Sequence, residues 1–332
     1  MEQPLLDVRH LRTVYMTDAG LVRAVDDVSF DLRPGERLGV VGESGSGKSA
    51  TAASIMGLIE PPGAVVGGQA WFKGRDLLAM AEDELSQIRG RDIAIIFQDP
   101  MTALDPVFTI GDQMVETLRA HLDVTRREAV EIAAQALADV HIPNPRRRLD
   151  DYPHQFSGGM RQRVVIAMAL MCSPSLIIAD EPTTALDVTT QAQVMDLMLG
   201  LADERGAAVM LIAHDLGVVA GFCETVQVMY AGKLVERSPV DDVYRRPGHP
   251  YTRGLLDSVS HLGADGDRRL RSIPGMPPSL LDPPPGCRFH PRCDYAADVC
   301  RAIEPEPVPV GGERLVACHF AKDLAATLET SR

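Results

Sequence analysis

The segment Gly42-Glu43-Ser44-Gly45-Ser46-Gly47-Lys48-Ser49 decides the fold class of this 332-residue chain. It fits the pattern G-x-x-x-x-G-K-S, in which glycines let backbone N–H groups converge on phosphate oxygens without Cβ clashes. The apolar run at residues 37–41 predicts a buried strand before the loop, and residues 49–58 predict a helix after it. A strand, a glycine loop and a helix in this order begin a parallel α/β unit that binds nucleotide phosphates.

The loop predicts a specific set of nucleotide contacts. Lys48 would reach the β- and γ-phosphates, the Ser49 hydroxyl would bind Mg²⁺, and the helix start would add its positive dipole end. The alternative is a glycine-rich turn that happens to precede a helix, and the filled motif positions argue against it. The predicted nucleotide contacts are Gly42, Ser44, Gly45, Ser46, Gly47, Lys48, Ser49 and Ala50.

A second apolar run, at residues 176–179, ends in two carboxylates. A buried strand beside the first one would deliver Asp180 to the Mg²⁺ shell. Glu181 follows directly and would polarise the attacking water as a general base. The alternative is that both carboxylates merely cap the strand end.

Composition limits the functional classes that fit this chain. Hydrophobic residues make up 45% and charged residues 24%, as in an ordinary globular protein, and the net charge of -13 argues against a nucleic-acid-binding surface. The longest apolar run, residues 164–172, is far shorter than the roughly 20 residues of a spanning helix, and the N-terminus lacks signal-peptide features. We therefore expect a cytoplasmic protein whose membrane work goes through partner subunits.

The remaining pattern suggests an α/β domain with an inserted helical block and a small C-terminal module. Helical spacing without turn residues at 112–140 predicts a helix inside a subdomain of about 105–171. The composition shifts near residue 250, and the proline-rich residues 274–285 predict no regular structure. Further strands are expected at residues 5–15, 24–32, 93–97, 207–213, 226–230 and 232–236.

The segment FSGGMRQR at residues 156–163 resembles the signature motif of ABC-type ATPases, which normally reads LSGGQ. Other motifs follow in that family's order and extend the resemblance over residues 5–240. They are the Q-loop residue Gln98, the D-loop residues Ala185-Leu186-Asp187, the switch residue His214 and the aromatic Tyr15. Phe156 and Met160 depart from the usual signature, whereas its serine and both glycines are intact.

The resemblance implies an ABC nucleotide-binding domain that hydrolyses ATP with Mg²⁺. It implies that Glu181 activates water, that His214 contacts the γ-phosphate and that Tyr15 stacks on adenine. Gln98 would connect the nucleotide to residues 99–110, which face membrane subunits in the family. The Mg²⁺ ligands implied are Ser49, Gln98 and Asp180. The residues implied to complete the ATP site of a partner subunit are Ser157, Gly158, Gly159 and Asp187.

Six cysteines fall into two groups. Cys172 and Cys223 are isolated in apolar surroundings and read as inert buried thiols. The other four crowd the C-terminal region and lack the C-x2-C pairs that a zinc ribbon usually shows. Four thiolates suit either zinc or an iron–sulfur cluster. They are Cys287, Cys293, Cys300 and Cys318. His290 and His319 are alternative ligands, and Arg288 and Arg292 would offset thiolate charge unless they lie in a solvated loop.

Three segments at residues 248–256, 273–275 and 286–293 (GHPYTRGLL, IPG and GCRFHPRC) resemble the C-terminal extension of oligopeptide and dipeptide ABC importer ATPases. The resemblance implies a domain at residues 1–250 and an extension at 251–332 with a [4Fe-4S] cluster, zinc and unliganded thiols being the alternatives. It also implies a peripheral subunit at the cytoplasmic face of the membrane. The partners implied are a second, non-identical ABC ATPase, two transmembrane permeases and an extracytoplasmic substrate-binding protein, with no nucleic acid.

Alternative functions remain open at this point. Relatives of the same subfamily serve nickel uptake, so the motor could drive import of nickel or another small solute. A non-transport ABC ATPase acting on nucleic acid or ribosomes would show two cassettes or long coiled-coil inserts, which this chain lacks. A small-molecule kinase would need neither the signature nor the switch histidine.

Overall fold

The computed structural model describes residues 3–99, 103–183, 187–258 and 273–324. The chain divides into two compact units. The first contains Met1–Pro4, Leu32–Arg37 and Ala79–Leu211. The second contains Leu5–Asp31, Leu38–Leu78 and Ile212–Arg332. No helix among the described residues is long and apolar enough to cross a membrane.

An antiparallel sheet of four strands forms the N-terminal part of the second unit, in the order β2-β1-β4-β5. Its strands are β1 (Leu6–Thr17), β2 (Gly20–Leu32), β4 (Gly63–Phe72) and β5 (Arg75–Asp76). β1 pairs with β4 from Leu6 opposite Phe72 to Tyr15 opposite Gly63. The sequence did not suggest β4, since glycines weaken a strand pattern and β4 begins with one.

A second set of strands in this unit carries the phosphate loop. β3 (Arg37–Val41) runs parallel to β9 (Thr225–Tyr230), which pairs antiparallel with β10 (Lys233–Pro239). The predicted strand at residues 37–41 is thus confirmed, and four of its five residues are buried. α1 (Lys48–Ile55) follows the loop, and the Oγ atoms of Thr13 and Ser54, 2.6 Å apart, connect it to β1.

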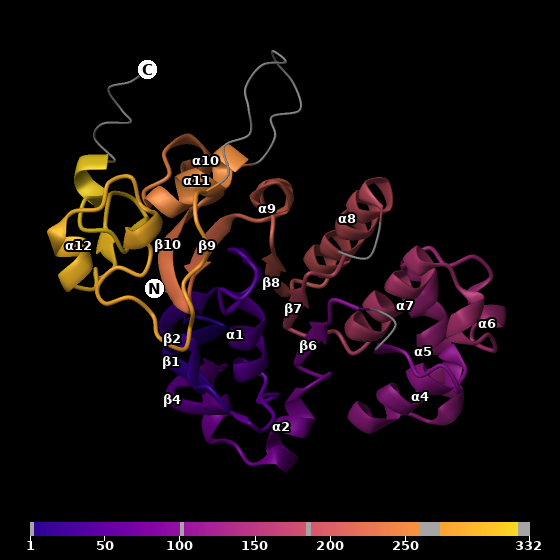
Figure 1. Cartoon of the computed structure of the whole chain (residues 1–332). Helices are drawn as coiled ribbons and strands as arrows, with labels where there is room; N and C mark the ends of the chain where they lie inside the picture. Colours follow the sequence, from indigo (N-terminus) through magenta and orange to yellow (C-terminus); the bar gives the residue numbers. More distant parts are fainter. Residues whose placement is uncertain (1–2, 100–102, 184–186, 259–272, 325–332) are drawn as a thin grey trace. The chain divides into compact units, whose positions relative to one another are not determined.

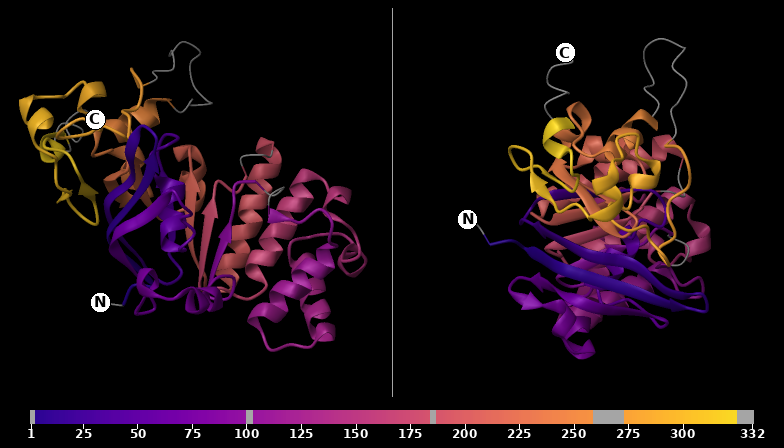
Figure 2. Two further views of the ribbon diagram at one scale, coloured as in Figure 1. Left: turned by 60° about the horizontal axis from the view of Figure 1, so that its bottom comes forward. Right: turned by 60° about the vertical axis from the view of Figure 1, so that its left-hand side comes forward.

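The chain after residue 250 belongs to the second unit. Its Leu280 carbonyl accepts a hydrogen bond of 3.1 Å from the Arg23 N–H, so this segment lies along β2 (Figure 2). Near the C-terminus, β12 (Leu315–Val316) pairs with β10 and with β11 (Val308–Pro309). Residues 274–285 contain no helix or strand, as predicted. Besides α1, this unit contains the helices α9 (Leu216–Phe222), α10 (Val240–Arg245), α11 (Pro250–Ser258) and α12 (Asp298–Ala302), with short 3-10 turns η1 (Leu77–Ala79) and η3 (His290–Arg292).

In the first unit, two buried parallel strands lead to the candidate residues Gln98, Asp180 and Glu181. β6 (Ile93–Ile96) pairs with β7 (Leu176–Asp180), with Ile93 opposite Leu176. Both strands were predicted from their apolar runs, and burial on both faces explains why those runs do not alternate. The next strand, β8 (Ala208–Ala213), is buried throughout and crosses the boundary between the units.

The first unit contains one helix before β6 in the sequence and a group of helices between β6 and β8 (Figure 1). They are α2 (Glu82–Ile88), α4 (Ile110–His121), α5 (Arg126–Asp139), α6 (Pro145–Arg148), α7 (Gly158–Leu170) and α8 (Val188–Glu204), with the 3-10 turn η2 (Pro153–Gln155). Residues 105–171 contain helices and no strand.

The predicted continuous helix at residues 112–140 is wrong in one respect, because it breaks into α4 and α5. The chain leaves the helix at Leu122, which is extended, and starts again at Thr125. There Thr125 Oγ1 accepts from the Glu128 N–H while the Glu128 side chain accepts from the Thr125 N–H, a capping box. The T-x-x-E spacing carried this signal, and apolar periodicity alone does not detect it.

Candidate nucleotide-binding site

The phosphate loop lies in the second unit, directly before α1. Ser44, Gly45 and Ser49 are exposed, whereas Lys48 is only 5% exposed. The Lys48 Nζ donates to the carbonyl of Gly42 at 2.8 Å and to that of Glu43 at 3.2 Å. The loop therefore holds the lysine ammonium inside its own curve, at the start of α1.

Two glycines in the loop have no room for a side chain. Gly47 has φ 104°, and a Cβ added there would lie 2.3 Å from the Ala24 carbonyl oxygen. A Cβ on Gly42 would lie 2.2 Å from the Met229 carbonyl oxygen. These contacts pack the loop against β2 and β9, so the glycine spacing in the sequence reflects backbone packing as well as phosphate access.

The predicted carboxylates lie in the first unit, at the carboxyl end of β7. Asp180 is the last residue of the strand and is half-buried. Glu181 follows with φ 45°, in the left-handed region that non-glycine residues seldom occupy. The Gln98 Nε2 donates to Glu181 Oε2 at 3.2 Å, which brings together the two side chains expected at the ends of β6 and β7.

The signature segment starts a helix. Ser157 is extended and caps α7, with its Oγ accepting from the Met160 N–H. Phe156 is buried beneath the Arg148 guanidinium, which lies 5.4 Å from the ring centroid. Ser157 and Gly158 remain exposed. The departure from leucine to Phe156 therefore fills a packing position and leaves the helix tip accessible.

Asp187 begins α8, and its Oδ1 accepts from the Thr190 N–H at 3.0 Å. The signature helix tip lies beside this start, since a Cβ on Gly159 would lie 2.9 Å from Thr190 Cγ2. The structure thus brings Gly159 and the D-loop end together within one unit. The predicted D-loop residues 185 and 186 lie outside the described residues.

Two further predicted residues belong to the second unit. His214 follows β8 and is exposed. Tyr15 is half-buried on β1 opposite Gly63, where a Cβ added to the glycine would lie 2.6 Å from Tyr15 Cε1. A glycine at this position leaves room for the tyrosine ring.

The four C-terminal cysteines line a single small cavity. None of the six cysteines, all of which lie among the described residues, forms a disulfide. Burial raises the pKa of Cys293 and of Cys318 to about 11, so these thiols stay protonated unless a cation compensates. Among the described residues, however, no group of three or more His, Cys, Asp or Glu side chains is arranged to hold a metal ion.

The flanking residues differ from the predictions made for them. Arg288 and Arg292 were expected to offset thiolate charge or to lie in solvent, but both are buried and pair with carboxylates elsewhere in the second unit. The two predicted alternative ligands, His290 and His319, each have a ring nitrogen 2.9 Å from a backbone carbonyl oxygen. His290 Nδ1 contacts the Cys287 oxygen and His319 Nε2 contacts the Ile303 oxygen.

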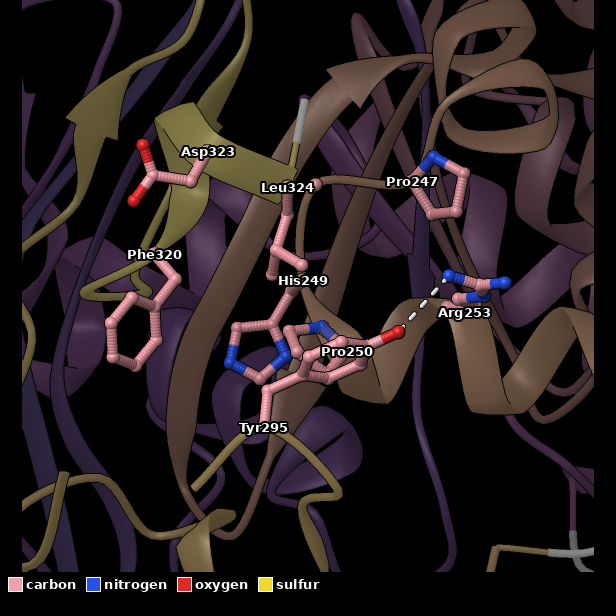
Figure 3. A pocket seen from close by; sticks show the side chains of 9 residues that line it. Pro247, His249, Pro250, Arg253, Tyr295, Phe320, Asp323 and Leu324 are labelled. Atoms are coloured by element: carbon pink, nitrogen blue, oxygen red, sulfur yellow. Dashed lines mark hydrogen bonds between the residues drawn. The ribbon is translucent and has the colours of Figure 1, made fainter. Parts of the chain in front are cut away.

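A larger apolar pocket lies beside the cysteine cavity and shares His249, Pro250, Tyr295 and Phe320 with it (Figure 3). The Arg253 Nη1 donates to the Tyr295 hydroxyl at 3.3 Å along one wall. Arg253 precedes and Tyr295 follows the cysteine turn, which we define as residues 287–293. The cavity that the thiols line is therefore flanked by apolar side chains.

Sequence reasoning missed two residues that support the phosphate loop. The Glu43 N–H donates to the Tyr251 hydroxyl at 2.8 Å, across 208 positions of sequence. Tyr251 is fully buried, and its ring lies 4.5 Å from that of Tyr230 at the end of β9. Tyr251 stood inside the GHPYTRGLL segment, but only the folded chain reveals that its hydroxyl reaches the loop.

Comparison with known families gives two matches on this chain. Residues 25–184 match the family "ABC transporter", and residues 235–300 match "Oligopeptide/dipeptide transporter, C-terminal region". The first match contains the phosphate loop, the signature and the carboxylate strand. The second contains Tyr251 and three of the four C-terminal cysteines.

Curated relatives match nearly the full length. A probable peptide ABC transporter ATP-binding protein of Sinorhizobium fredii is 53% identical over 96% of this chain and 96% of its own. The oligopeptide transport ATP-binding protein OppD of Escherichia coli is 51% identical over 95% of this chain and 92% of its own.

Solved structures resemble a large part of the chain. A dimeric ATP-binding cassette in a post-hydrolysis state, bound to ADP and phosphate, is 27% identical with a TM-score of 0.63. It covers 71% of this chain and 98% of the cassette. The protein cbiO1 of Clostridium perfringens, part of the ABC transporter complex cbiONQ, is 25% identical with a TM-score of 0.62, covering 73% and 91%.

Proposed function

The chain belongs to the family of ATP-binding subunits of peptide ABC transporters, and from this premise we propose that it hydrolyses ATP to power the import of short peptides. The observation that carries the ATPase activity is the phosphate loop with Lys48 held inside it by two backbone carbonyls. The peptide cargo is supported by full-length similarity to peptide transport proteins and by the match at residues 235–300.

Each predicted residue has a defined task in this proposal. The loop N–H groups and Lys48 bind the phosphates and neutralise charge on the transferred phosphoryl group. Glu181 accepts a proton from the attacking water, and its hydrogen bond with Gln98 orients the carboxylate for that role. His214 contacts the γ-phosphate, and Tyr15 stacks on adenine.

The proposed Mg²⁺ site consists of Ser49, Asp180 and Gln98. A hydroxyl, a carboxylate and an amide oxygen form the oxygen donor set that this ion prefers. When bound, Mg²⁺ would supply positive charge that offsets the negative charge of the nucleotide phosphates. Ser49 is exposed at the start of α1, and Asp180 is half-buried at the end of β7.

The tip of α7 acts on a partner subunit in this proposal. Ser157, Gly158 and Gly159 offer a helix N-terminus to an anion, and Asp187 lies on the helix beside it. ATP would join two such subunits, and hydrolysis would release them. We propose a non-identical second ATPase, two transmembrane permeases and an extracytoplasmic binding protein as partners, with this chain peripheral at the cytoplasmic membrane face.

We further propose that residues 251–332 form an extension whose four cysteines hold a [4Fe-4S] cluster. The support is that all four thiols line one cavity. A cubane cluster takes one thiolate at each of four corners, so its ligands surround a volume instead of meeting at a point. When bound, the cluster supplies positive iron charge to thiols that burial otherwise keeps protonated.

Reconstitution tests the transport function. The chain would be co-expressed with its permeases and partner ATPase, and ATP hydrolysis would be measured in liposomes with a peptide-loaded binding protein. We expect peptide to stimulate hydrolysis and Glu181→Gln to abolish it while ATP binding persists. Stimulation by nickel and not by peptide would favour the metal-importing alternative, and hydrolysis that survives Glu181→Gln would contradict the role of Glu181.

Iron and sulfide analysis with visible absorption tests the cluster. Anaerobically purified protein should contain about four irons and four sulfides per chain and absorb broadly in the visible. Stoichiometric zinc without colour, or metal-free thiols, would overturn the cluster assignment without affecting the ATPase proposal.

A further inference from the structure

Glu43 creates an electrostatic problem for the phosphate loop. It is the second residue of the loop, and its carboxylate puts a negative charge on a segment proposed to bind a triphosphate. Its backbone is part of the loop, because the Glu43 carbonyl accepts from Ser46 N–H at 3.1 Å and from Lys48 Nζ at 3.2 Å. The Glu43 side chain is 27% exposed, so solvent only partly screens it.

Arg292 compensates that charge with a two-pronged ion pair. Its Nη1 and Nη2 donate to Glu43 Oε2 and Oε1 at 2.7 and 3.0 Å. The Arg292 side chain is 5% exposed, and hydrogen bonding to Glu43 raises the pKa of the guanidinium above its ordinary value. Because the guanidinium is planar, two parallel hydrogen bonds to one carboxylate fix its orientation as well as the position of its charge.

The surroundings of Arg292 fix its orientation. Its Nε donates to the Pro274 carbonyl at 3.0 Å, and Nη1 also reaches the Tyr230 hydroxyl at 3.3 Å. The guanidinium lies 5.8 Å from the Tyr230 ring centroid. These contacts hold the guanidinium against Pro274 and Tyr230, where it faces Glu43.

The cysteine turn supplies the backbone of Arg292. η3 (His290–Arg292) lies directly between Cys287 and Cys293, and the Arg292 N–H donates to the Phe289 carbonyl at 3.0 Å. The Phe289 ring packs 5.2 Å from Tyr230 and 5.4 Å from Tyr251. The same turn that brings the thiols to their cavity therefore also directs the guanidinium to the loop.

We propose that Arg292 is a positioning residue for ATP binding, which holds the Glu43 carboxylate in place and neutralises its negative charge within the phosphate loop. The proposal rests on the ATP-binding function above. It assigns a role in the nucleotide site to the cysteine-bearing extension, 249 positions away in sequence. Arg292 acts through Glu43 and touches no phosphate itself.

Charge compensation predicts effects of opposite sign for the two partners. Arg292→Gln leaves Glu43 uncompensated and should weaken ATP binding by about tenfold, the effect of one unit charge near a protein surface. Glu43→Gln removes the negative charge but keeps the arginine, so it should tighten ATP binding by several-fold. The double variant should return close to the wild-type affinity.

A purely structural role predicts a different pattern, because breaking the pair from either side would then weaken binding. The experiment measures the dissociation constant of a fluorescent ATP analogue on the full-length chain at low and high salt. Arg301→Gln removes an exposed arginine of the same extension and serves as the matched control. The difference between Arg292→Gln and wild type should shrink at high salt.

Each outcome decides one question. Wild-type protein that binds no ATP analogue would refute the proposed function. Normal wild-type binding with equal losses in Arg292→Gln and Glu43→Gln, or with no loss in either, would refute the positioning role alone. If Arg292→Gln fails to fold, Glu43→Gln still tests the idea, since weakened binding in that variant would overturn it.

Discussion

His249 should make the stability of the second unit depend on pH between about 6.5 and 3. The residue is 2% exposed and precedes α11, which begins with Pro250. Its Nδ1 accepts from the Tyr251 N–H at 3.0 Å, the bond of an N-cap residue. Burial lowers the pKa of His249 from 6.5 to about 3, so the folded ring stays neutral where the unfolded ring becomes charged.

The sign and size follow from linkage. Between these pKa values the unfolded chain binds more protons than the folded chain, so stability falls as pH falls. At pH 5.5, one unit below the unfolded value, the loss is about 1.4 kcal/mol relative to pH 7.5. With a urea dependence of about 2 kcal/mol per molar, the unfolding midpoint should drop by roughly 0.7 M.

Trp71 on β4 is the only tryptophan of the chain and reports unfolding of the same unit. Urea titrations followed by its fluorescence would compare the wild type with His249→Asn, which keeps a side-chain acceptor for the helix start but does not titrate. We expect the variant to be less stable at pH 7.5 because it loses ring packing against Phe289, yet to lack the pH-dependent drop. An equal drop in both proteins would refute the assignment to His249.

Three further predictions concern other parts of the chain. Gly159→Ala should abolish transporter-stimulated ATP hydrolysis, because its Cβ would lie 2.9 Å from Thr190 Cγ2, whereas Gly200→Ala on α8 meets nothing within 4 Å and should retain activity. Thr125→Ala should lower the free energy of unfolding by about 1 kcal/mol, measured by urea titration followed by circular dichroism, because it removes the N-cap of α5. Cys293→Ser should reduce visible absorption and, through the adjacent turn, weaken ATP-analogue binding in the same direction as Arg292→Gln. Unchanged colour and unchanged binding would contradict the last prediction.

Local patterns predicted the buried strands and the phosphate loop because the information lies in consecutive residues. Residues 37–41, 93–97 and 176–179 are apolar runs bounded by turns or carboxylates, and each forms a strand of the parallel type. The loop was predicted from its glycine spacing, and a Cβ added at Gly42 or Gly47 would lie too close to a backbone oxygen. Periodicity failed where another local rule acted, at the Thr125 capping box.

Contacts between residues far apart in the sequence could not be predicted from it, because side-chain pairing depends on how distant segments meet in the folded chain. Arg292 read as a possible counter-charge for thiolates because four cysteines stand nearby in sequence. In the folded chain its guanidinium points to Glu43 instead, and Arg288 likewise pairs with Asp26. A polar residue buried against a distant partner has no signature in composition, since nothing in its neighbours specifies the partner.

The phosphate loop and the C-terminal extension share their supporting contacts. On one side of residue 250, Tyr230 ends β9 and Glu43 belongs to the loop. On the other side, the Tyr251 hydroxyl accepts a hydrogen bond from the loop backbone, and Phe289 packs on both tyrosine rings. Because a buried ion pair that loses one partner leaves an uncompensated charge, the loop and the extension depend on each other energetically. Any change that displaces the cysteine turn is therefore expected to alter nucleotide binding through the pair of Arg292 with Glu43.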